Sequence, residues 1–152
     1  MKKITPFLWF DTQAEEAMKF YVSIFKNSKV LSVSPGPNGI ASSVNFELEG
    51  QEFMGFNAGP EFKFNEAISM FVNCQTQGEV DELWNKLTAD GGEEGRCGWL
   101  KDKYGLSWQV IPSALGELMG DPDPAKSQRV MQAMLKMNKI IIADLKRAYD
   151  QK

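Results

Sequence analysis

The chain offers few side chains that could carry out acid–base or nucleophilic chemistry. None of its 152 residues is histidine. Its clustered carboxylates fall at positions 47–49, 93–94 and 121–123, which are typical of strand ends, loops and helix caps. General acid–base catalysis needs titratable groups held within hydrogen-bond reach of the reacting atoms. The sequence supplies no such dyad, so its catalytic residues are unknown and whether it is an enzyme stays open.

The remaining candidates for chemistry are two thiols and one cation beside an aromatic ring. Cys74 and Cys97 form no CxxC pair, so we expect unpaired packing residues and no disulfide or metal ligand set. Arg96 and Trp99 follow a glycine turn, and at a pocket mouth they would bind an anionic or planar ligand. The alternative is a solvated arginine beside a half-buried tryptophan.

Composition excludes several classes of partner. With 43% apolar and 24% charged residues, the chain has an average globular composition and the length of one ordinary domain. A net charge of −3 without a basic stripe argues against a nucleic-acid partner. No apolar stretch approaches the roughly 18 residues of a membrane span, and no signal-peptide core follows Met1. We therefore expect a cytoplasmic protein with no membrane partner.

A strand-then-helix pattern occurs twice in the sequence. The apolar run beginning at Phe7 recurs at Met70, 63 positions downstream, and the helical spacing that follows it recurs as well. Thr12 and Thr76 each precede a glutamate by three residues, which is the spacing of a capping box. The pattern predicts a duplicated module in which each helix begins just after its threonine.

Further strands follow each predicted helix, separated by turn-forming residues. The glycine- and proline-rich run 35–39 is interpreted as a hairpin turn between two strands. The fold class is therefore α+β, with two tandem βαβββ modules at about 1–60 and 65–112 that form one domain, 1–112. The strands expected after the helices are 29–34, 41–48 and 52–57 in the first module and 97–101 and 105–111 in the second.

Residues 113–152 form a helical C-terminal extension of different composition. A short helix is expected at 113–119, and Asp123 and Pro124 are suited to the cap and first turn of the next helix. Four of the eight methionines lie in this extension, beside apolar stripes that include Val130 and Leu145. The stripes either cover the domain or pack on a second subunit, where adaptable methionines suit an interface. We expect a homodimer.

Several segments resemble the vicinal oxygen chelate superfamily, which contains glyoxalase I, extradiol dioxygenases and bleomycin- and fosfomycin-resistance proteins. Residues 20–25 (Phe-Tyr-Val-Ser-Ile-Phe) are similar to its first helix, and residues 101–110 to its closing strand. Segments 4–10, 98–112 and 121–134 are similar to the PhnB-like subgroup, often labelled 3-demethylubiquinone 3-methyltransferase. The resemblance implies that the sheets of the two modules curl around a cavity.

Superfamily members typically hold a divalent metal with one residue from the first and one from the last strand of each module. The positions that match those ligands in this chain are Pro6, Phe53 or Gly55, Ser69 and Gln109. Only Gln109 is a good donor, whereas such a metal requires a set of histidines or carboxylates. We therefore expect neither a metal nor another cofactor.

Strand alternation from Gln109 predicts which side chains face the cavity. By this parity the predicted ligand-binding residues are Leu8, Phe10, Asn57, Ser69, Phe71 and Gln109, and the loop residues Arg96 and Trp99 are added to them as a cation and an aromatic ring near the pocket mouth. Gly55, Asn73 and Ser107 share the same parity, whereas Trp9 and Trp108 are expected beneath the helices. Apolar walls with scattered amides and hydroxyls are typical of small-molecule sites, although aromatic strand residues also serve simply as core.

Two functions from different classes follow. The first is a metal-free small-molecule-binding protein, in the manner of the bleomycin-resistance members. The second is an enzyme acting on a quinone-like or other planar molecule, by the methyl transfer of the subgroup label or as a metal-dependent lyase or dioxygenase. Methyl transfer lacks support from the residues, because no glycine-rich turn joins the first strand to its helix at 11–14. The sequence favours the binding protein.

Overall fold

The computed structural model describes residues 2–151. The predicted first module begins at Met1 and the predicted extension ends at Lys152, and both of these residues lie outside the described residues. The chain divides into two compact units, Met1–Phe64 and Asn65–Lys152. Each unit contains one βαβββ module, and the helical extension belongs to the second. The predicted α+β class and the duplicated module are confirmed. That the two modules enclose a cavity stays a prediction.

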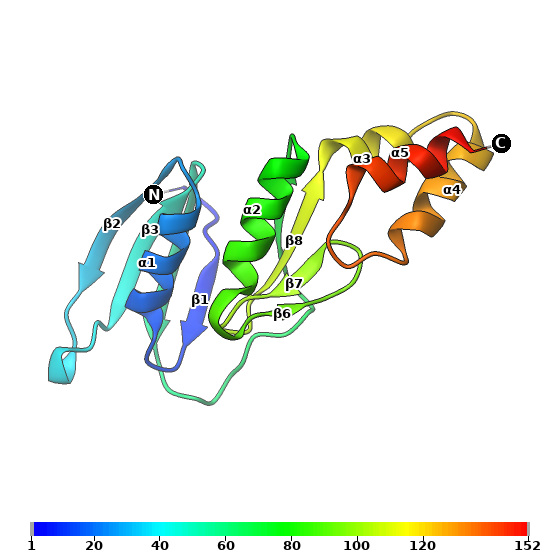
Figure 1. The fold of residues 1–152 in the computed structure, drawn as a ribbon. Helices are drawn as coiled ribbons and strands as arrows, with labels where there is room; N and C mark the ends of the chain where they lie inside the picture. The colour runs from blue at the N-terminus through cyan, green and yellow to red at the C-terminus, as the bar shows by residue number, and fades with distance from the viewer. Residues whose placement is uncertain (1, 152) are drawn as a thin grey trace. The chain divides into compact units, whose positions relative to one another are not determined.

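The first unit is a four-stranded mixed sheet with one helix on it (Figure 1). The sheet order is β1-β4-β3-β2; β1 runs parallel to β4, and the other pairs are antiparallel. A parallel pair needs a long crossover, and the chain provides it through the helix and the two outer strands. The elements are β1 (Phe7–Phe10), α1 (Ala14–Ile24), β2 (Ser28–Ser34), a 3-10 turn η1 (Pro37–Gly39), β3 (Ser43–Leu48) and β4 (Gln51–Asn57).

The core of the first unit lies between α1 and one face of its sheet. The buried helix residues recur at helical spacing, and in β3 buried and half-buried residues alternate. Tyr21 of α1 stacks on Phe46 of β3, which in turn stacks on Phe53 of β4 with ring centroids 5.4 Å apart. All three side chains are buried. The alternation therefore fixes which face of the sheet α1 covers.

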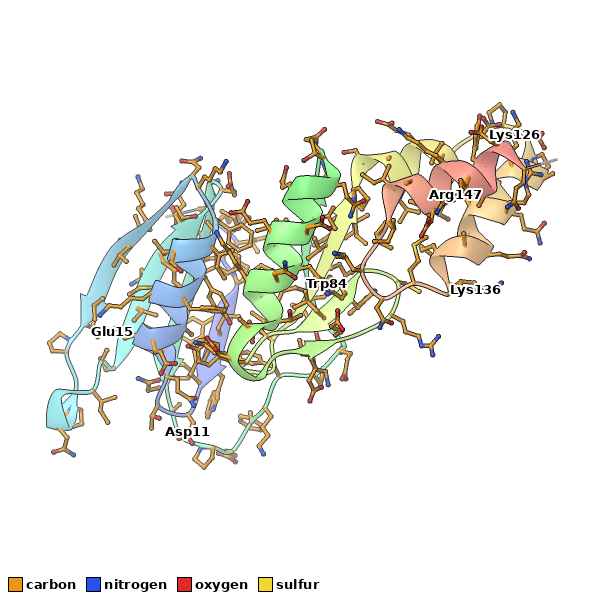
Figure 2. The ribbon with its side chains drawn as sticks, in the orientation of Figure 1. Asp11, Glu15, Trp84, Lys126, Lys136 and Arg147 are labelled. Atoms are coloured by element: carbon orange, nitrogen blue, oxygen red, sulfur yellow. The ribbon has the colours of Figure 1, made fainter. Side chains whose placement is uncertain are left out.

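The second unit repeats this order with shorter outer strands. Its sheet order is β5-β8-β7-β6, again with a single parallel pair, β5 with β8. Helix α2 covers one face through Val80, Leu83, Trp84 and Leu87, and Figure 2 shows Trp84 where α2 meets the strands. The elements are β5 (Met70–Cys74), α2 (Gln77–Thr88), a 3-10 turn η2 (Ala89–Gly91), β6 (Glu93–Glu94), β7 (Trp99–Lys101) and β8 (Ser107–Pro112).

The extension forms three helices that follow directly from β8: α3 (Ser113–Met119), α4 (Pro124–Met134) and α5 (Ile142–Asp150). Val130 and Leu145 of these helices and Ile140 of the connection between α4 and α5 are buried against Ile111 and Leu115. The predicted stripes thus cover the chain's own second module, and the predicted cap at Asp123 is confirmed because its side chain accepts from the Ala125 amide. Figure 2 places Lys126 and Arg147 on these helices, away from the strands. No helix within residues 2–151 has the length and apolar character of a membrane span.

The two sheet-covering helices are capped by different devices. The Thr76 hydroxyl accepts from the Glu79 amide, which confirms the predicted cap of α2. The capping box predicted at Thr12 is wrong, because Gln13 occupies the cap position of α1 and makes no side-chain cap bond. Instead, Asn57 at the end of β4 accepts from the Ala14 amide at 2.9 Å. A partner 43 residues away therefore replaces the local one.

Candidate functional site

The candidate site is the face of the second sheet opposite α2. In the strand register, Gln109 of β8 lies between Phe71 of β5 and Trp99 of β7. Residues directly opposite each other in a sheet share a face, so these three side chains form one row. The other face, with Leu100 and Trp108 buried, packs beneath α2. The predicted placement of Trp108 is therefore confirmed, and Phe71, Trp99 and Gln109 are brought together.

Polar and apolar groups alternate across this face. The Gln109 side-chain amide donates to the Ser69 hydroxyl at 2.9 Å, which fixes the orientation of the amide. Phe71 keeps 61% of its surface exposed, an unusual state for a large aromatic side chain in a strand. Trp99 is half-buried. The row therefore presents two aromatic surfaces on either side of an oriented amide.

A charged row runs beside the aromatic row. Lys101 lies opposite Ser107 on one side and Glu93 on the other. Its ammonium forms an ion pair with Glu66; this bond lowers the pKa of Glu66 and raises the pKa of Lys101, so both groups are held charged. The Ser107 hydroxyl is buried and has no hydrogen-bond partner within residues 2–151. The sequence prediction missed Lys101, although strand alternation from Trp99 places it on this face.

Arg96 stands on the loop between β6 and β7, at the edge of the candidate site. Its side chain is exposed, and its carbonyl accepts from the Trp99 amide at 3.0 Å. The backbone turn therefore ties Arg96 closely to Trp99, as their spacing in the sequence suggested.

The predicted parity is wrong for the first module. Leu8 and Phe10 are only 5% and 3% exposed and belong to the core beneath α1. Gly55 opposite Leu8 leaves room for this packing, since an added Cβ would lie 3.3 Å from the Phe10 ring. Asn57 is occupied structurally, because its oxygen accepts from Ala14 and its nitrogen donates to the Ala41 carbonyl at 2.7 Å.

Trp9, predicted beneath the helix, lies on the opposite face of the first sheet. Its ring meets Phe56 and Phe62 edge to face, with centroids 5.0 and 4.9 Å apart. Phe7 packs on Phe56 in the same manner at 4.8 Å, and the indole N–H of Trp9 donates to the Gly59 carbonyl at 2.9 Å. All four residues of β1 are apolar, so alternation in the sequence could not decide between the faces.

The polar residues of the predicted closing motif organise a turn. Asp102 is buried; one carboxylate oxygen accepts from the Tyr104 and Leu106 amides, and the other accepts from the Trp108 indole at 2.8 Å. This carboxylate therefore shapes the β7–β8 hairpin that aligns Trp99 with Gln109.

Elsewhere in the unit, burial raises the pKa of the Cys74 thiol to about 12, which leaves it protonated and unreactive at neutral pH.

The architecture agrees with what comparison with known proteins shows. The sequence profile of the 3-demethylubiquinone-9 3-methyltransferase family matches residues 2–111. A PhnB protein from Bacillus cereus is 37% identical; the similarity covers 74% of this chain and 100% of that chain, with a TM-score of 0.69. This chain belongs to the PhnB-like 3-demethylubiquinone-9 3-methyltransferase family.

The fold of this family member extends to more distant proteins. The fosfomycin resistance protein FosX from Listeria monocytogenes is 18% identical, covers 76% of this chain and 94% of its own, and has a TM-score of 0.58. A second FosX structure, complexed with Mn(II) and sulfate, has a TM-score of 0.54 at the same 18% identity, over 71% of this chain and 90% of its own. These likenesses show that the fold is shared with the fosfomycin resistance proteins. No curated protein matches the chain.

The metal positions implied by the superfamily do not fit a metal in this family member. Phe53 is buried against Phe46, Gly55 has no side chain, and Ser69 is engaged by Gln109. Within residues 2–151, no three histidine, cysteine or carboxylate side chains converge in a way that could hold a metal ion. A neutral amide and hydroxyl are a poor donor set for a tightly held divalent ion.

Proposed function

We propose that this PhnB-like protein binds a planar small molecule on the open face of its second sheet and that binding needs no metal. The observation that carries the proposal is the row in which Gln109, oriented by Ser69, lies between Phe71 and Trp99. Aromatic walls supply affinity, and a few fixed polar groups supply orientation. The exposure of Phe71 supports a ligand that covers it.

The chemistry of this face favours a planar molecule that carries a hydrogen-bond acceptor or donor. A primary amide fixed by one bond offers its remaining groups to a ligand without further loss of side-chain freedom. The Lys101–Glu66 pair adds one charge of each sign at the border of the row. A planar ring with carbonyl substituents, such as a quinone, satisfies both the stacking surfaces and the amide.

An enzyme that acts on a quinone-like molecule is the second candidate, because the family description names methyl transfer to a demethylubiquinone. The fold gives methyl transfer little support. A nucleotide-type methyl donor would be expected to bind at the strand ends of a doubly wound parallel sheet. Each sheet here has only a single parallel pair of strands. Binding without chemistry is therefore the function that the site supports better.

The first experiment measures divalent metal by elemental mass spectrometry on untagged protein purified without chelators. We expect far less than one metal per chain, because the ligand positions lack histidines and carboxylates. The same protein is then titrated with 1,4-naphthoquinone, and binding is followed by the quenching of tryptophan fluorescence. Metal near one equivalent would overturn the metal-free proposal, and quenching without saturation would overturn the site.

Variants locate the bound probe on the open face. We expect Phe71→Ala and Gln109→Ala each to weaken naphthoquinone binding about five- to tenfold, in keeping with the loss of one stacking surface or one hydrogen bond. Leu135→Ala, which truncates an exposed apolar residue of α4, is the matched control and should leave binding unchanged. A time-dependent change in the quinone absorbance without added metal would favour the enzyme.

We also propose that the protein forms a homodimer. It is supported by Met131 and Leu135 of α4, which keep 43% and 51% of their surfaces exposed although the neighbouring stripe is buried. Light scattering on the full chain measures the number of subunits.

A further inference from the structure

The loop that carries Arg96 and enters β7 at Trp99 has an unusual backbone. Cys97 and the following Gly98 both have left-handed conformations, with φ of 59° and 84°. A residue with a Cβ is disfavoured there, so surrounding contacts must hold Cys97 in place. Gly98 tolerates no side chain, because an added Cβ would lie 2.6 Å from the Ile111 side chain and 3.1 Å from the Val110 carbonyl.

The contacts that hold this loop come from the C-terminal extension. The Cys97 and Gly98 amides donate to the carbonyls of Met137 and Asn138, both at 2.8 Å. Figure 1 shows the connection between α4 and α5 passing close to β7 before it enters α5. Residues 137–142, which we call the strap, therefore supply the acceptors that two consecutive left-handed residues need.

The strap is in turn fixed to α2. The Gln77 side chain donates to the Ile140 carbonyl at 3.0 Å and accepts from the Ile142 amide at 2.8 Å. Lys139 forms an ion pair with Asp81 at 2.9 Å. The Ile140 side chain is fully buried in the cluster beneath the extension. One amide side chain thus bonds two backbone groups in the C-terminal half of the strap, where the buried Ile140 side chain also anchors it.

We propose that the strap positions Trp99 and Arg96 for the ligand by holding the loop that carries them. The strap lies beyond residue 111, where the match to the family ends. The extension is therefore a functional part of the ligand site as well as a cover for the module. The inference rests on the proposed function, because it assumes that Trp99 contacts the ligand.

The test compares Gln77→Ala with the matched control Gln75→Ala. Both change a glutamine beside the start of α2, but Gln75 donates to Ser113 at 3.3 Å and makes none of the strap bonds described. The first readout is the rate at which Cys97 reacts with 5,5′-dithiobis(2-nitrobenzoate). Cys74 is silent in this assay, because it is buried and its pKa is about 12.

We expect Gln77→Ala to raise the Cys97 reaction rate about tenfold, because local opening of the loop becomes easier without the strap bonds. The same variant should weaken naphthoquinone binding about fivefold, and Gln75→Ala should change neither quantity. Circular dichroism melting confirms that each variant is folded. If Gln77→Ala fails to fold, Lys139→Ala removes only the ion pair and should show the same two changes at smaller size.

The outcomes separate the two proposals. A faster Cys97 with unchanged probe affinity overturns the positioning role, and an unchanged Cys97 rate overturns the strap itself. Wild-type protein that does not bind naphthoquinone would overturn the proposed ligand site. If the Cys97 reaction is still faster in Gln77→Ala than in wild-type protein, the strap nevertheless holds the loop.

Discussion

The two modules share one topology but are stabilised by different local devices. Both have the strand order first-fourth-third-second with a single parallel pair. The first joins β3 to β4 through Glu49 and Gly50, both with positive φ, as a two-residue hairpin requires. The second joins β7 to β8 through a longer turn built around the buried Asp102. Topology is therefore kept by packing between helix and sheet, whereas turns and caps differ freely.

The two modules also differ at the outer edges of their sheets. The outer strand of the first, β2, has seven residues and lies exposed at the sheet edge. The outer strand of the second, β6, has only two, and the helices of the extension pack on the second module. A long exposed edge invites pairing with another chain, whereas a two-residue edge offers few free backbone groups for such pairing. The second sheet thus has the shorter outer edge of the two.

The largest expected effect breaks the first module alone. Phe46→Ala removes the ring stacked between Tyr21 and Phe53 and should lower the free energy of unfolding by about 3–5 kcal/mol. Urea unfolding measures the loss, and hydrogen exchange by mass spectrometry should show it mainly in peptides from residues 1–64. Phe7→Ala, at an exposed ring, should cost less than about 1 kcal/mol. If hydrogen exchange in Phe46→Ala became faster to the same extent in both units, the cores of the two units would not be independent.

A smaller effect separates the two hairpins. Asp102→Ala leaves two backbone amides and the Trp108 indole without their acceptor and should cost about 2–4 kcal/mol. Glu49→Asn, in the other hairpin, should stabilise by about 0.5 kcal/mol, because asparagine tolerates the left-handed backbone better. Thermal melting of both variants shows the opposite signs. A destabilised Glu49→Asn would mean that the Glu49 side chain matters more than its backbone.

The smallest effects distinguish the caps. Asn57→Ala should cost about 1–2 kcal/mol because it leaves the Ala14 amide and the Ala41 carbonyl unpaired, and Thr76→Ala about 1 kcal/mol. Thr12→Ala should change stability by less than about 0.5 kcal/mol, since Thr12 does not cap α1. Urea titrations of the three variants give the order. A costly Thr12→Ala would restore the predicted capping box.

Much of the fold was predictable because periodicity and turn residues are local signals. The run 35–39 does connect two strands, and the second-module strands expected at 97–101 and 105–111 correspond to β7 and β8. Strand β6 was not predicted, because a two-residue strand carries no alternation. Lys101 and Glu66 were missed as a pair because 35 residues separate them in the sequence.

The sequence by itself determined the duplicated βαβββ order, the family and the shared face of Phe71 and Gln109, whereas only the structure placed Trp99 in one row with them. In that module, strand parity counted from Gln109 assigned the faces. Only the tertiary structure decided that Leu8 and Phe10 face α1 while Trp9 faces away. A strand that is apolar on both sides fits either orientation, and the choice depends on distant partners such as Gly55. The contact of the strap with Gln77 likewise depends on the tertiary structure, since one side chain bonds backbone groups 63 and 65 residues away.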